Sequence, residues 1–314
     1  MIHVEQHGPV LAIRMSRAFL GRPFWWTTAY WVDGLLIDAG PKSTAQELLR
    51  ALKRLQVNQI VITHGHEDHI GGLEELHRQY PEATIYASPR TLAIIKDPAK
   101  IQMQMYRRIL WGQPRPLHAV VSLDSVNNVL KSPSFSFRVV ETPGHSPDHV
   151  TFFEPTQRWV FCGDAFISGR DDAWSPEYDM FGVISSLRTL ASLRPERLFP
   201  GDGWVSRTPL PALHEKMGQL LRLTREVAQL DAAGQSVPDM ADRLFSREST
   251  LNFWTFGHFS AIHLIEACRS YNAIFAPLGD NGNAAALSPA ESDETADPSD
   301  SSTKWSTDWG DLMR

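Results

Sequence analysis

The amino-acid sequence predicts an α/β fold that carries a helical appendage at its C-terminal end. Residues 1–208 alternate short apolar or β-branched runs with helical stretches and turn signals, which is typical of an α/β core. From Ala212 onward the apolar residues follow a helical spacing instead. With 314 residues, 42% of them hydrophobic, the chain is long enough for one large domain or for a domain with an appendage.

The individual elements are predicted in order from composition and turn residues. Short runs rich in Val, Ile, Phe and Tyr predict strands over 10–15, 29–40, 59–64, 83–88, 135–144, 150–155, 158–166 and 197–203. Helical spacing predicts a helix over 213–234 that Gly234 closes, a second over 238–245 that Pro238 opens, and a third over 259–271. The sequence therefore predicts a core domain over 1–208 and a helical appendage over 209–279.

The last segment differs in composition from the rest of the chain. Beyond Gly279 it is rich in Ser, Asp, Ala and Pro and nearly lacks aliphatic residues. Such a segment cannot bury enough apolar surface to offset the entropy lost on ordering, which predicts a disordered acidic tail over 280–314. Trp305 and Trp309 in this tail leave open a short motif that orders on a partner.

Charge and hydropathy exclude several classes of function. The net charge is -6 and Lys and Arg form no cluster, so we expect no binding to nucleic acid. No apolar run reaches the roughly 18 residues that span a bilayer, and the first residues lack the layout of a signal peptide. We therefore expect a cytoplasmic protein that acts on a small molecule and contacts no membrane. Two cysteines, Cys162 and Cys268, are expected to be reduced, and the oligomeric state is not indicated.

The stretch QIVITHGHEDHIGG, residues 59–72, contains four potential metal ligands: His64, His66, Asp68 and His69. The first two lie two residues apart at the end of a strand, so both imidazoles can point the same way and hold one ion. The other two follow where the chain turns into a helix, so their side chains can hold a second ion nearby. A polar loop with chance histidines is the alternative, and the spacing disfavours it.

This stretch resembles the H-x-H-x-D-H motif of the metallo-β-lactamase superfamily. Two later segments extend the resemblance: VVETPGHSPDH is similar to the family's P-G-H-[ST]-P-G-H segment, and WVFCGDAF is similar to its strand that ends in Gly-Asp. The resemblance covers roughly residues 10–205 and implies the family's four-layer αββα sandwich. It also implies that His145 is the third ligand of the first ion, that Asp164 bridges both ions, and that Asp38 supports the ligands.

The chain departs from the family pattern at the position of the sixth ligand. Many members carry P-G-H-G at the end of a late strand, and this chain has LFPGDGW with Asp202 in place of the histidine. If Asp202 ligates, the second site is rich in hard oxygen, which favours iron or manganese there. Otherwise Asp202 shapes a turn, or His258 or His263 replaces the lost ligand. Asp148 is another departure, since the family usually has glycine there.

The resemblance implies a hydrolase with two divalent metal ions, expected to be zinc, that attacks its substrate with a metal-bound hydroxide. The expected substrate is a thioester, ester or lactone, as in the glyoxalase II and lactonase branches. Asp68 would both ligate and accept a hydrogen bond from the attacking water. The alternatives are a persulfide dioxygenase with a single iron and a metal-stabilised binding protein without catalysis.

The segment IQMQMYRRILWGQP, residues 101–114, has two interpretations. Relatives in the family place helices over the metal cleft at this point, and Met and aromatic side chains suit a substrate pocket. Ordinary helix packing is the alternative, because Ile101, Met105 and Ile109 recur at a spacing of four.

Overall fold

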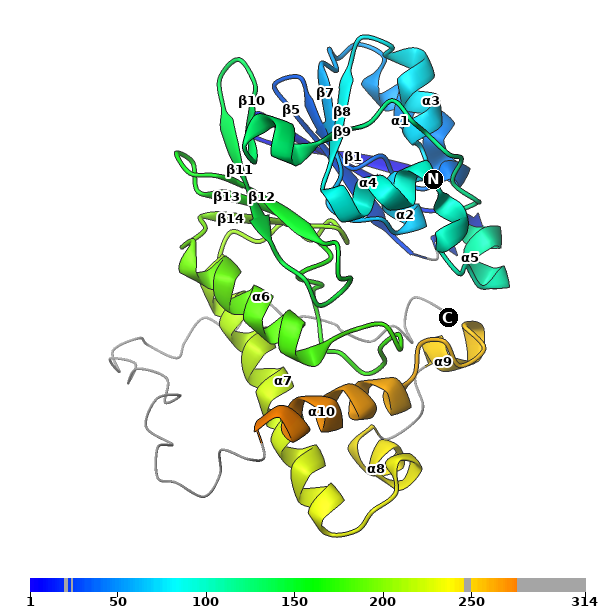
Figure 1. Cartoon of the computed structure of the whole chain (residues 1–314), viewed down its shortest axis with the longest axis vertical. Helices are drawn as coiled ribbons and strands as arrows, with labels where there is room; N and C mark the ends of the chain where they lie inside the picture. The colour runs from blue at the N-terminus through cyan, green and yellow to red at the C-terminus, as the bar shows by residue number, and fades with distance from the viewer. Residues whose placement is uncertain (20–21, 24, 246–249, 276–314) are drawn as a thin grey trace. The chain divides into compact units, whose positions relative to one another are not determined.

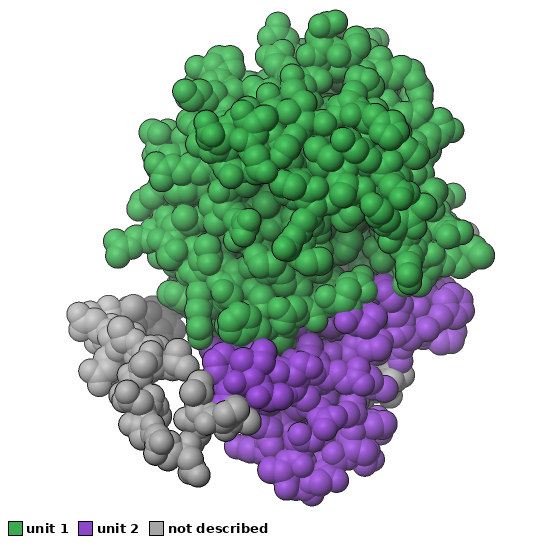
Figure 2. All heavy atoms as spheres, in the orientation of Figure 1, with its two compact units in different colours: residues 1–168, 177–220 green, residues 169–176, 221–314 purple. Residues whose placement is uncertain are grey.

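The computed structural model of the chain describes residues 1–19, 22–23, 25–245 and 250–275. The chain divides into two compact units (Figure 2), of which the first comprises Met1–Ser168 and Glu177–Leu220 and the second comprises Gly169–Pro176 and the chain from Leu221 onward. The predicted boundaries at residues 208 and 279 stay predictions. The tail predicted over 280–314 lies outside the described residues.

The first unit contains two β-sheets. In the described part of the chain, one sheet has the order β1-β2-β5-β6-β7-β8-β9, with bounds Ile2–His7, Val10–Met15, Thr27–Val32, Leu35–Ile37, Gln59–Val61, Thr84–Ala87 and Val121–Ser122. The other has the order β10-β11-β12-β13-β14, with bounds Val129–Lys131, Ser136–Glu141, Val150–Glu154, Trp159–Gly163 and Arg197–Pro200. Strands β6 to β9 pair in parallel, so their carboxyl ends meet at one edge of the first sheet.

The two sheets pack face to face through an apolar layer. The first sheet contributes Val10, Tyr30, Ile37 and Val61 to this layer, and the second contributes Phe137, Phe152, Phe161 and Phe199. Side chains alternate between the two faces of a strand, so Ile13 and Met15 of β2 point to the opposite face. The burial of both faces explains why β2 was predicted from an almost continuous apolar run.

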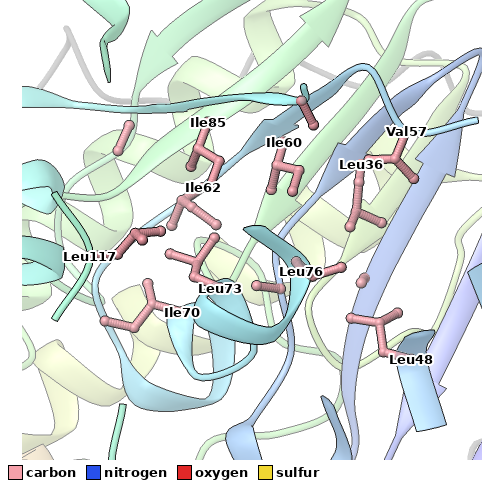
Figure 3. Packing of buried hydrophobic residues seen from close by; sticks show 14 of the residues in the cluster. Leu36, Leu48, Val57, Ile60, Ile62, Ile70, Leu73, Leu76, Ile85 and Leu117 are labelled. Atoms are coloured by element: carbon pink, nitrogen blue, oxygen red, sulfur yellow. The ribbon is translucent and has the colours of Figure 1, made fainter. Parts of the chain in front are cut away.

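Helices cover the outer faces of both sheets. Helices α1 (Ala45–Leu52), α3 (Leu73–Gln79) and α4 (Pro89–Lys96) lie on the first sheet. Figure 3 shows this packing, with Leu48, Leu73 and Leu76 against Leu36, Ile60 and Ile85. Helix α6 (Met180–Ser192) lies along the second sheet (Figure 1). The order helix, sheet, sheet, helix confirms the predicted four-layer αββα sandwich.

Helices also form most of the second unit. Helix α7 (Pro209–Ala232) starts in the first unit and ends in the second, which further contains α8 (Val237–Leu244), α9 (Thr250–Trp254) and α10 (Ala261–Phe275). Asn272 of α10 donates a hydrogen bond to the carbonyl oxygen of Thr224 on α7 at 2.8 Å. The predicted C-terminal helices are therefore present. None of the helices in the described ranges is long and apolar enough to cross a membrane.

Shorter elements connect these layers: β3 (Ala18–Phe19), β4 (Arg22–Pro23), α2 (Glu67–Ile70), α5 (Met105–Leu110) and the 3-10 helices Lys42–Thr44, Pro98–Lys100 and Leu123–Val126. Helix α5 corrects one interpretation of residues 101–114. Met105 and Ile109, two members of the supposed packing stripe, are 69% and 57% exposed, whereas Tyr106 and Arg107 are buried. The prediction that Met105 and Ile109 pack against the core was wrong, because this helix is short and packs through its opposite face.

Candidate metal centre

Six of the seven predicted metal ligands lie on three loops at one edge of the sandwich, and the seventh, Asp202, lies on the loop that follows β14. Four of them follow β7, His145 lies between β11 and β12, and Asp164 directly follows β13. Among the described residues, two groups have ligand atoms within 4.8 Å of one another: His64, His66 and His145 in the first cluster, and His64, His69 and Asp164 in the second. Residues that lie up to a hundred positions apart are thus brought to one place by the packing of the sheets.

Three imidazole nitrogens converge in the first cluster. His66 Nδ1 lies 3.0 Å from His64 Nε2 and 2.9 Å from His145 Nε2. Two nitrogens bound to one tetrahedral zinc ion, each about 2.0–2.1 Å from it, stand roughly 3.3 Å apart. The observed spacing is close to that of three ligands of a common ion.

Hydrogen bonds behind His64 determine which of its nitrogens faces the cluster. Thr63 donates its hydroxyl proton to Asp38 Oδ2 at 2.9 Å, so its oxygen accepts the Nδ1 proton of His64 at 3.0 Å. Nε2 is then unprotonated and presents its lone pair to the cluster. Burial is the largest cause that lowers the pKa of both His64 and His145 well below the ordinary value. Both rings are therefore neutral near pH 7, which is the form that binds a metal ion.

The second cluster places one imidazole between two carboxylates. His69 Nε2 lies 3.7 Å from Asp68 Oδ2 and 3.5 Å from Asp164 Oδ1. His69 Nδ1 donates to Asp38 at 2.8 Å, and its Nε2 is buried with no hydrogen-bond partner in the described chain. The other oxygen of Asp164, Oδ2, lies 3.4 Å from His145 Nε2. The Asp164 carboxylate therefore faces both clusters.

The electrostatics of the second cluster suit a cation. Burial lowers the pKa of His69, but Asp164, Asp68 and Asp38 outweigh it and raise that pKa well above the ordinary value. Burial raises the pKa of Asp164, but His69 and His145 outweigh it and hold the pKa well below its usual range. The field that favours a proton between these groups also favours a metal cation. His69 Nε2 has no hydrogen-bond partner in the described chain and can serve as a ligand atom. These residues therefore fit the metal ions that the family resemblance implies.

Asp38 supports both clusters from behind. Its carboxylate accepts the backbone N–H of Thr63 at 2.8 Å as well as the Nδ1 proton of His69. Its backbone has a φ of 65°, a left-handed conformation that is uncommon for any residue other than glycine. Gly72 packs closely on this turn, since a Cβ there would lie 2.3 Å from the carbonyl oxygen of Ala39. The predicted supporting position of Asp38 agrees with these contacts.

His149 orients the backbone at Asp164. Its Nε2 accepts the backbone N–H of Asp164 at 3.1 Å, and its Nδ1 lies 2.9 Å from the hydroxyl oxygen of Thr142. Both ring nitrogens are therefore engaged in hydrogen bonds, and neither serves as a ligand atom. Burial lowers the pKa of His149 to about 4, so the ring is neutral when it accepts this bond.

Asp148, where the family pattern has glycine, fastens the ligand loop to α4. Its Oδ2 accepts the backbone N–H of Gly65 at 2.8 Å and the hydroxyl of Thr91 at 2.8 Å. Its backbone carbonyl accepts the hydroxyl of Ser88, at the start of α4, at 3.2 Å. Because Gly65 stands between two of the histidines in the first cluster, this buried carboxylate fixes their backbone. The sequence shows Asp148 as a departure from the family pattern and indicates no role for it.

The Asp202 carboxylate is engaged by the loop that follows β13 and by its own loop. Its Oδ2 accepts the backbone N–H and the hydroxyl of Ser168 at 2.8 and 2.6 Å, and its Oδ1 accepts the backbone N–H of Trp204 at 2.9 Å. These contacts support the turn-shaping alternative, and ligation by Asp202 stays a prediction. In the second unit, His258 lies 3.3 Å from the hydroxyl of Ser175, and His263 lies 3.5 Å from Glu266.

Two contacts of helix α2 were not predicted from the sequence. Thr27, at the start of β5, donates its hydroxyl proton to Asp68 Oδ2 at 2.8 Å. Arg107 of α5 donates from Nε and Nη2 to the two carboxylate oxygens of Glu67 at 2.6 and 2.7 Å. Glu67 is fully buried. In the sequence, an acidic residue next to the metal ligands was the one signal that could have indicated a cationic partner for it. Nothing in the sequence pattern indicated Thr27.

The chain is similar in sequence to a known protein family and to several known proteins. The model of the Metallo-beta-lactamase superfamily matches residues 27–202. The chain is 24% identical over 212 residues to the uncharacterized protein YobT of Bacillus subtilis, which covers 61% of this chain and 85% of that protein. It is 28% identical over 145 residues to a hydroxyacylglutathione hydrolase of Legionella pneumophila. The aligned region covers 46% of this chain and 47% of that enzyme. The chain thus spans about half the length of the latter relative.

Solved structures are similar in fold. A beta-lactamase domain protein from Burkholderia ambifaria matches with a TM-score of 0.65 and 16% identity, over 87% of this chain and 88% of that chain. A metallo-beta-lactamase family protein from Thermus thermophilus matches with a TM-score of 0.60 and 19% identity, over 84% of this chain and 94% of that chain. The family model spans more than half of the chain, and the motif residues lie in the two clusters. The chain therefore belongs to the metallo-beta-lactamase superfamily.

Proposed function

We propose that this protein is a metal-dependent hydrolase that cleaves a thioester, ester or lactone of a small molecule. The observation that carries the proposal is the Asp164 carboxylate, whose two oxygens face two adjacent clusters of ligand atoms. Divalent cations held there would lower the pKa of a coordinated water towards neutrality and polarise the acyl oxygen of the substrate. No serine or cysteine nucleophile is then required. The hydroxyacylglutathione hydrolases among the relatives favour a thioester.

Each ligand residue has a distinct part in this proposal. The imidazoles of the first cluster bind an ion as neutral donors and suit zinc. For a second ion, Asp68 joins His69 and Asp164 of the second cluster, and these two carboxylates and one imidazole suit zinc, iron or manganese. Thr27 holds one oxygen of Asp68, so the other oxygen is in a fixed position to accept a hydrogen bond from the attacking water. Asp38 holds His69 in the tautomer that leaves Nε2 free to ligate.

The contacts of Asp202 favour a second candidate function. Three hydrogen bonds occupy its carboxylate, which leaves the second cluster one ligand short of the family pattern. A depleted second site suits an enzyme with a single iron, such as a persulfide dioxygenase. A metal-stabilised binding protein is the remaining alternative.

Metal counting together with a substrate panel separates these candidates. Wild type, Asp202→Ala and Asp202→His are expressed in metal-replete medium and tested on a thioester, a lactone and a phosphodiester. We expect two ions per chain in wild type, hydrolysis of the thioester or lactone, and loss of hydrolysis on chelation. One iron in all three proteins, with oxygen consumed on a persulfide and no hydrolysis, would establish the dioxygenase instead. Metal without either activity would leave the binding protein.

The same three proteins test the part that Asp202 plays. If its carboxylate only shapes the loop, Asp202→Ala keeps the metal count of wild type and lowers the free energy of unfolding by about 1–3 kcal/mol. If it ligates, Asp202→Ala loses up to one ion, whereas Asp202→His keeps two. Elemental analysis per chain and thermal denaturation give the two readouts.

A further inference from the structure

Arg14 of β2 lies over two indole rings, beside the loop that follows β14. Its Cζ lies 4.9 Å from the ring centroid of Trp26 and 5.2 Å from that of Trp204. Two aromatic rings hold a guanidinium through its faces and leave the N–H groups on its edge available to a ligand. Trp204 is 56% exposed and Arg14 is partly exposed, so solvent reaches this arrangement.

The donors on the edge of Arg14 are largely unused. A guanidinium has five N–H donors, and the described residues engage one of them, through Nη2 to the backbone carbonyl of Asp202 at 3.5 Å. Nε is buried and has no hydrogen-bond partner in the described chain. Across the same residues no carboxylate forms an ion pair with Arg14. A partly buried cation without an anionic partner is uncommon, because burial of the charge opposes folding.

The loop after β14 joins this cation to the metal centre. A Cβ on Gly201 would lie 2.0 Å from Asp164 Oδ1, so this backbone touches the second cluster. A Cβ on Gly203 would lie 2.7 Å from Arg14 Nε, so the same backbone touches the guanidinium two residues later. Two residues of extended chain span at most about 7 Å. One small molecule can therefore reach both groups.

We propose that Arg14, Trp26 and Trp204 form a subsite for a carboxylate of the substrate. The planar guanidinium can donate two parallel hydrogen bonds to a carboxylate, and its contacts with the two indoles hold it in place. The net charge of -6 repels anions at long range. A local cation such as Arg14 therefore favours the binding of an anionic substrate group at this place. The substrate class narrows to acyl compounds that also carry a carboxylate, such as glutaryl thioesters. The acyl part of this inference rests on the proposed hydrolase function, whereas the anion subsite does not.

A binding experiment tests the subsite without turnover. Metal-loaded wild type, Arg14→Gln and Arg138→Gln are titrated by calorimetry with glutarate and with the uncharged glutaramide. We expect wild type to bind glutarate and not glutaramide, and Arg14→Gln to bind glutarate about 10- to 100-fold more weakly. Arg138 is an exposed arginine of β11, so its variant is the matched control and should bind as wild type does. Glutarate affinity that is unchanged in Arg14→Gln would overturn the proposal, since the carboxylate would then bind elsewhere, for example at the metal ions.

Kinetics on a matched pair of thioesters extend the test to the substrate. The glutaryl and glutaramyl thioesters differ in charge and little in shape, and the ratio of their KM values is the readout. We expect Arg14→Gln to raise the KM of the glutaryl relative to the glutaramyl compound by about 10- to 100-fold. An unchanged ratio contradicts the subsite. If wild type hydrolyses neither compound, the proposed function fails, and the calorimetry still decides on the subsite.

Two further variants keep the test independent of a folding defect in Arg14→Gln. Arg14→Lys keeps the charge and loses the planar pair of donors, so its glutarate affinity should lie between those of wild type and Arg14→Gln. Trp204→Leu alters a largely exposed ring, so the fold should persist while the affinity falls about two- to fivefold through the lost stacking. Wild-type affinity in both variants would overturn the proposal.

Discussion

Asp148 holds the ligand loop through the backbone N–H of Gly65 and reaches α4 through Thr91. We expect Asp148→Ala to lower metal affinity by about 10- to 100-fold, because the two histidines beside Gly65 lose their fixed spacing. The metal-free protein should also lose about 1–3 kcal/mol in free energy of unfolding, since a buried N–H and a buried hydroxyl lose their acceptor. Competition with a chelator and thermal denaturation measure the two effects.

A matched variant separates this local effect from a change in net charge. Glu141 is an exposed acid of β11. Glu141→Ala removes the same charge and should change neither quantity. Wild-type metal affinity in Asp148→Ala would mean that the loop is held sufficiently by its other contacts.

His149 makes the stability of the metal-free protein depend on pH. Burial lowers its pKa in the folded protein to about 4, whereas the unfolded chain has the ordinary value near 6.5. Between these values the unfolded state binds more protons, so stability is full above about pH 6.5 and falls as the pH drops towards 4. The expected loss from this residue is about 3 kcal/mol.

Urea denaturation of metal-free wild type and His149→Gln at pH 7.5, 6, 5 and 4 tests this expectation. The variant is less stable at pH 7.5, and its stability should fall less steeply over the range. Equal slopes for the two proteins would show that other buried histidines dominate.

At the scale of elements, the pair formed by Glu67 and Arg107 attaches α5 to the metal-binding loop. Arg107→Met leaves the fully buried Glu67 carboxylate without a partner. We expect it to lower the free energy of unfolding by about 3–5 kcal/mol. The double variant Glu67→Gln with Arg107→Met removes both charges and should recover part of this loss. Chemical denaturation of the four proteins of this cycle gives the coupling between the two residues. A double variant as unstable as Arg107→Met alone would contradict this account.

The elements that sequence predicted well are those with local causes. Strand β2 follows from an apolar run buried on both faces, and the grouping of His64, His66 and His69 follows from a spacing within one loop, whereas His145 was predicted only from the family resemblance. The packing of α5 was wrong because exposure depends on the rest of the fold, which the local spacing of four does not contain. The contacts of Thr27, Asp148 and Arg14 join residues far apart in sequence, and their hydroxyl, carboxylate and guanidinium groups are common on any surface. Only the pairing of strands within the first sheet and the docking of the two sheets bring such groups beside the ligands.

At the scale of the whole molecule, metal removal should lower thermal stability. A ligand that binds only the folded state stabilises it by an amount that grows with the logarithm of its free concentration over Kd, about 4 kcal/mol at a thousandfold excess. We expect chelation to lower the melting temperature by several degrees and readdition of zinc to restore it. The His66→Ala variant, which lacks one nitrogen of the first cluster, should respond less. A melting temperature that is independent of the chelator in wild type would contradict metal binding by these residues.

The clusters draw on both sheets: His64, His66 and His69 follow a strand of the first, whereas His145 and Asp164 follow strands of the second. A bound ion therefore acts as a cross-link across the apolar layer, in addition to the contacts between its aromatic residues. Since the complete set of ligands meets only once the sheets have docked, we expect full ligation on the native side of the folding barrier. Metal should consequently slow the unfolding rate while leaving the refolding rate nearly unchanged. The ion would lengthen the lifetime of the folded protein more than it would hasten its formation.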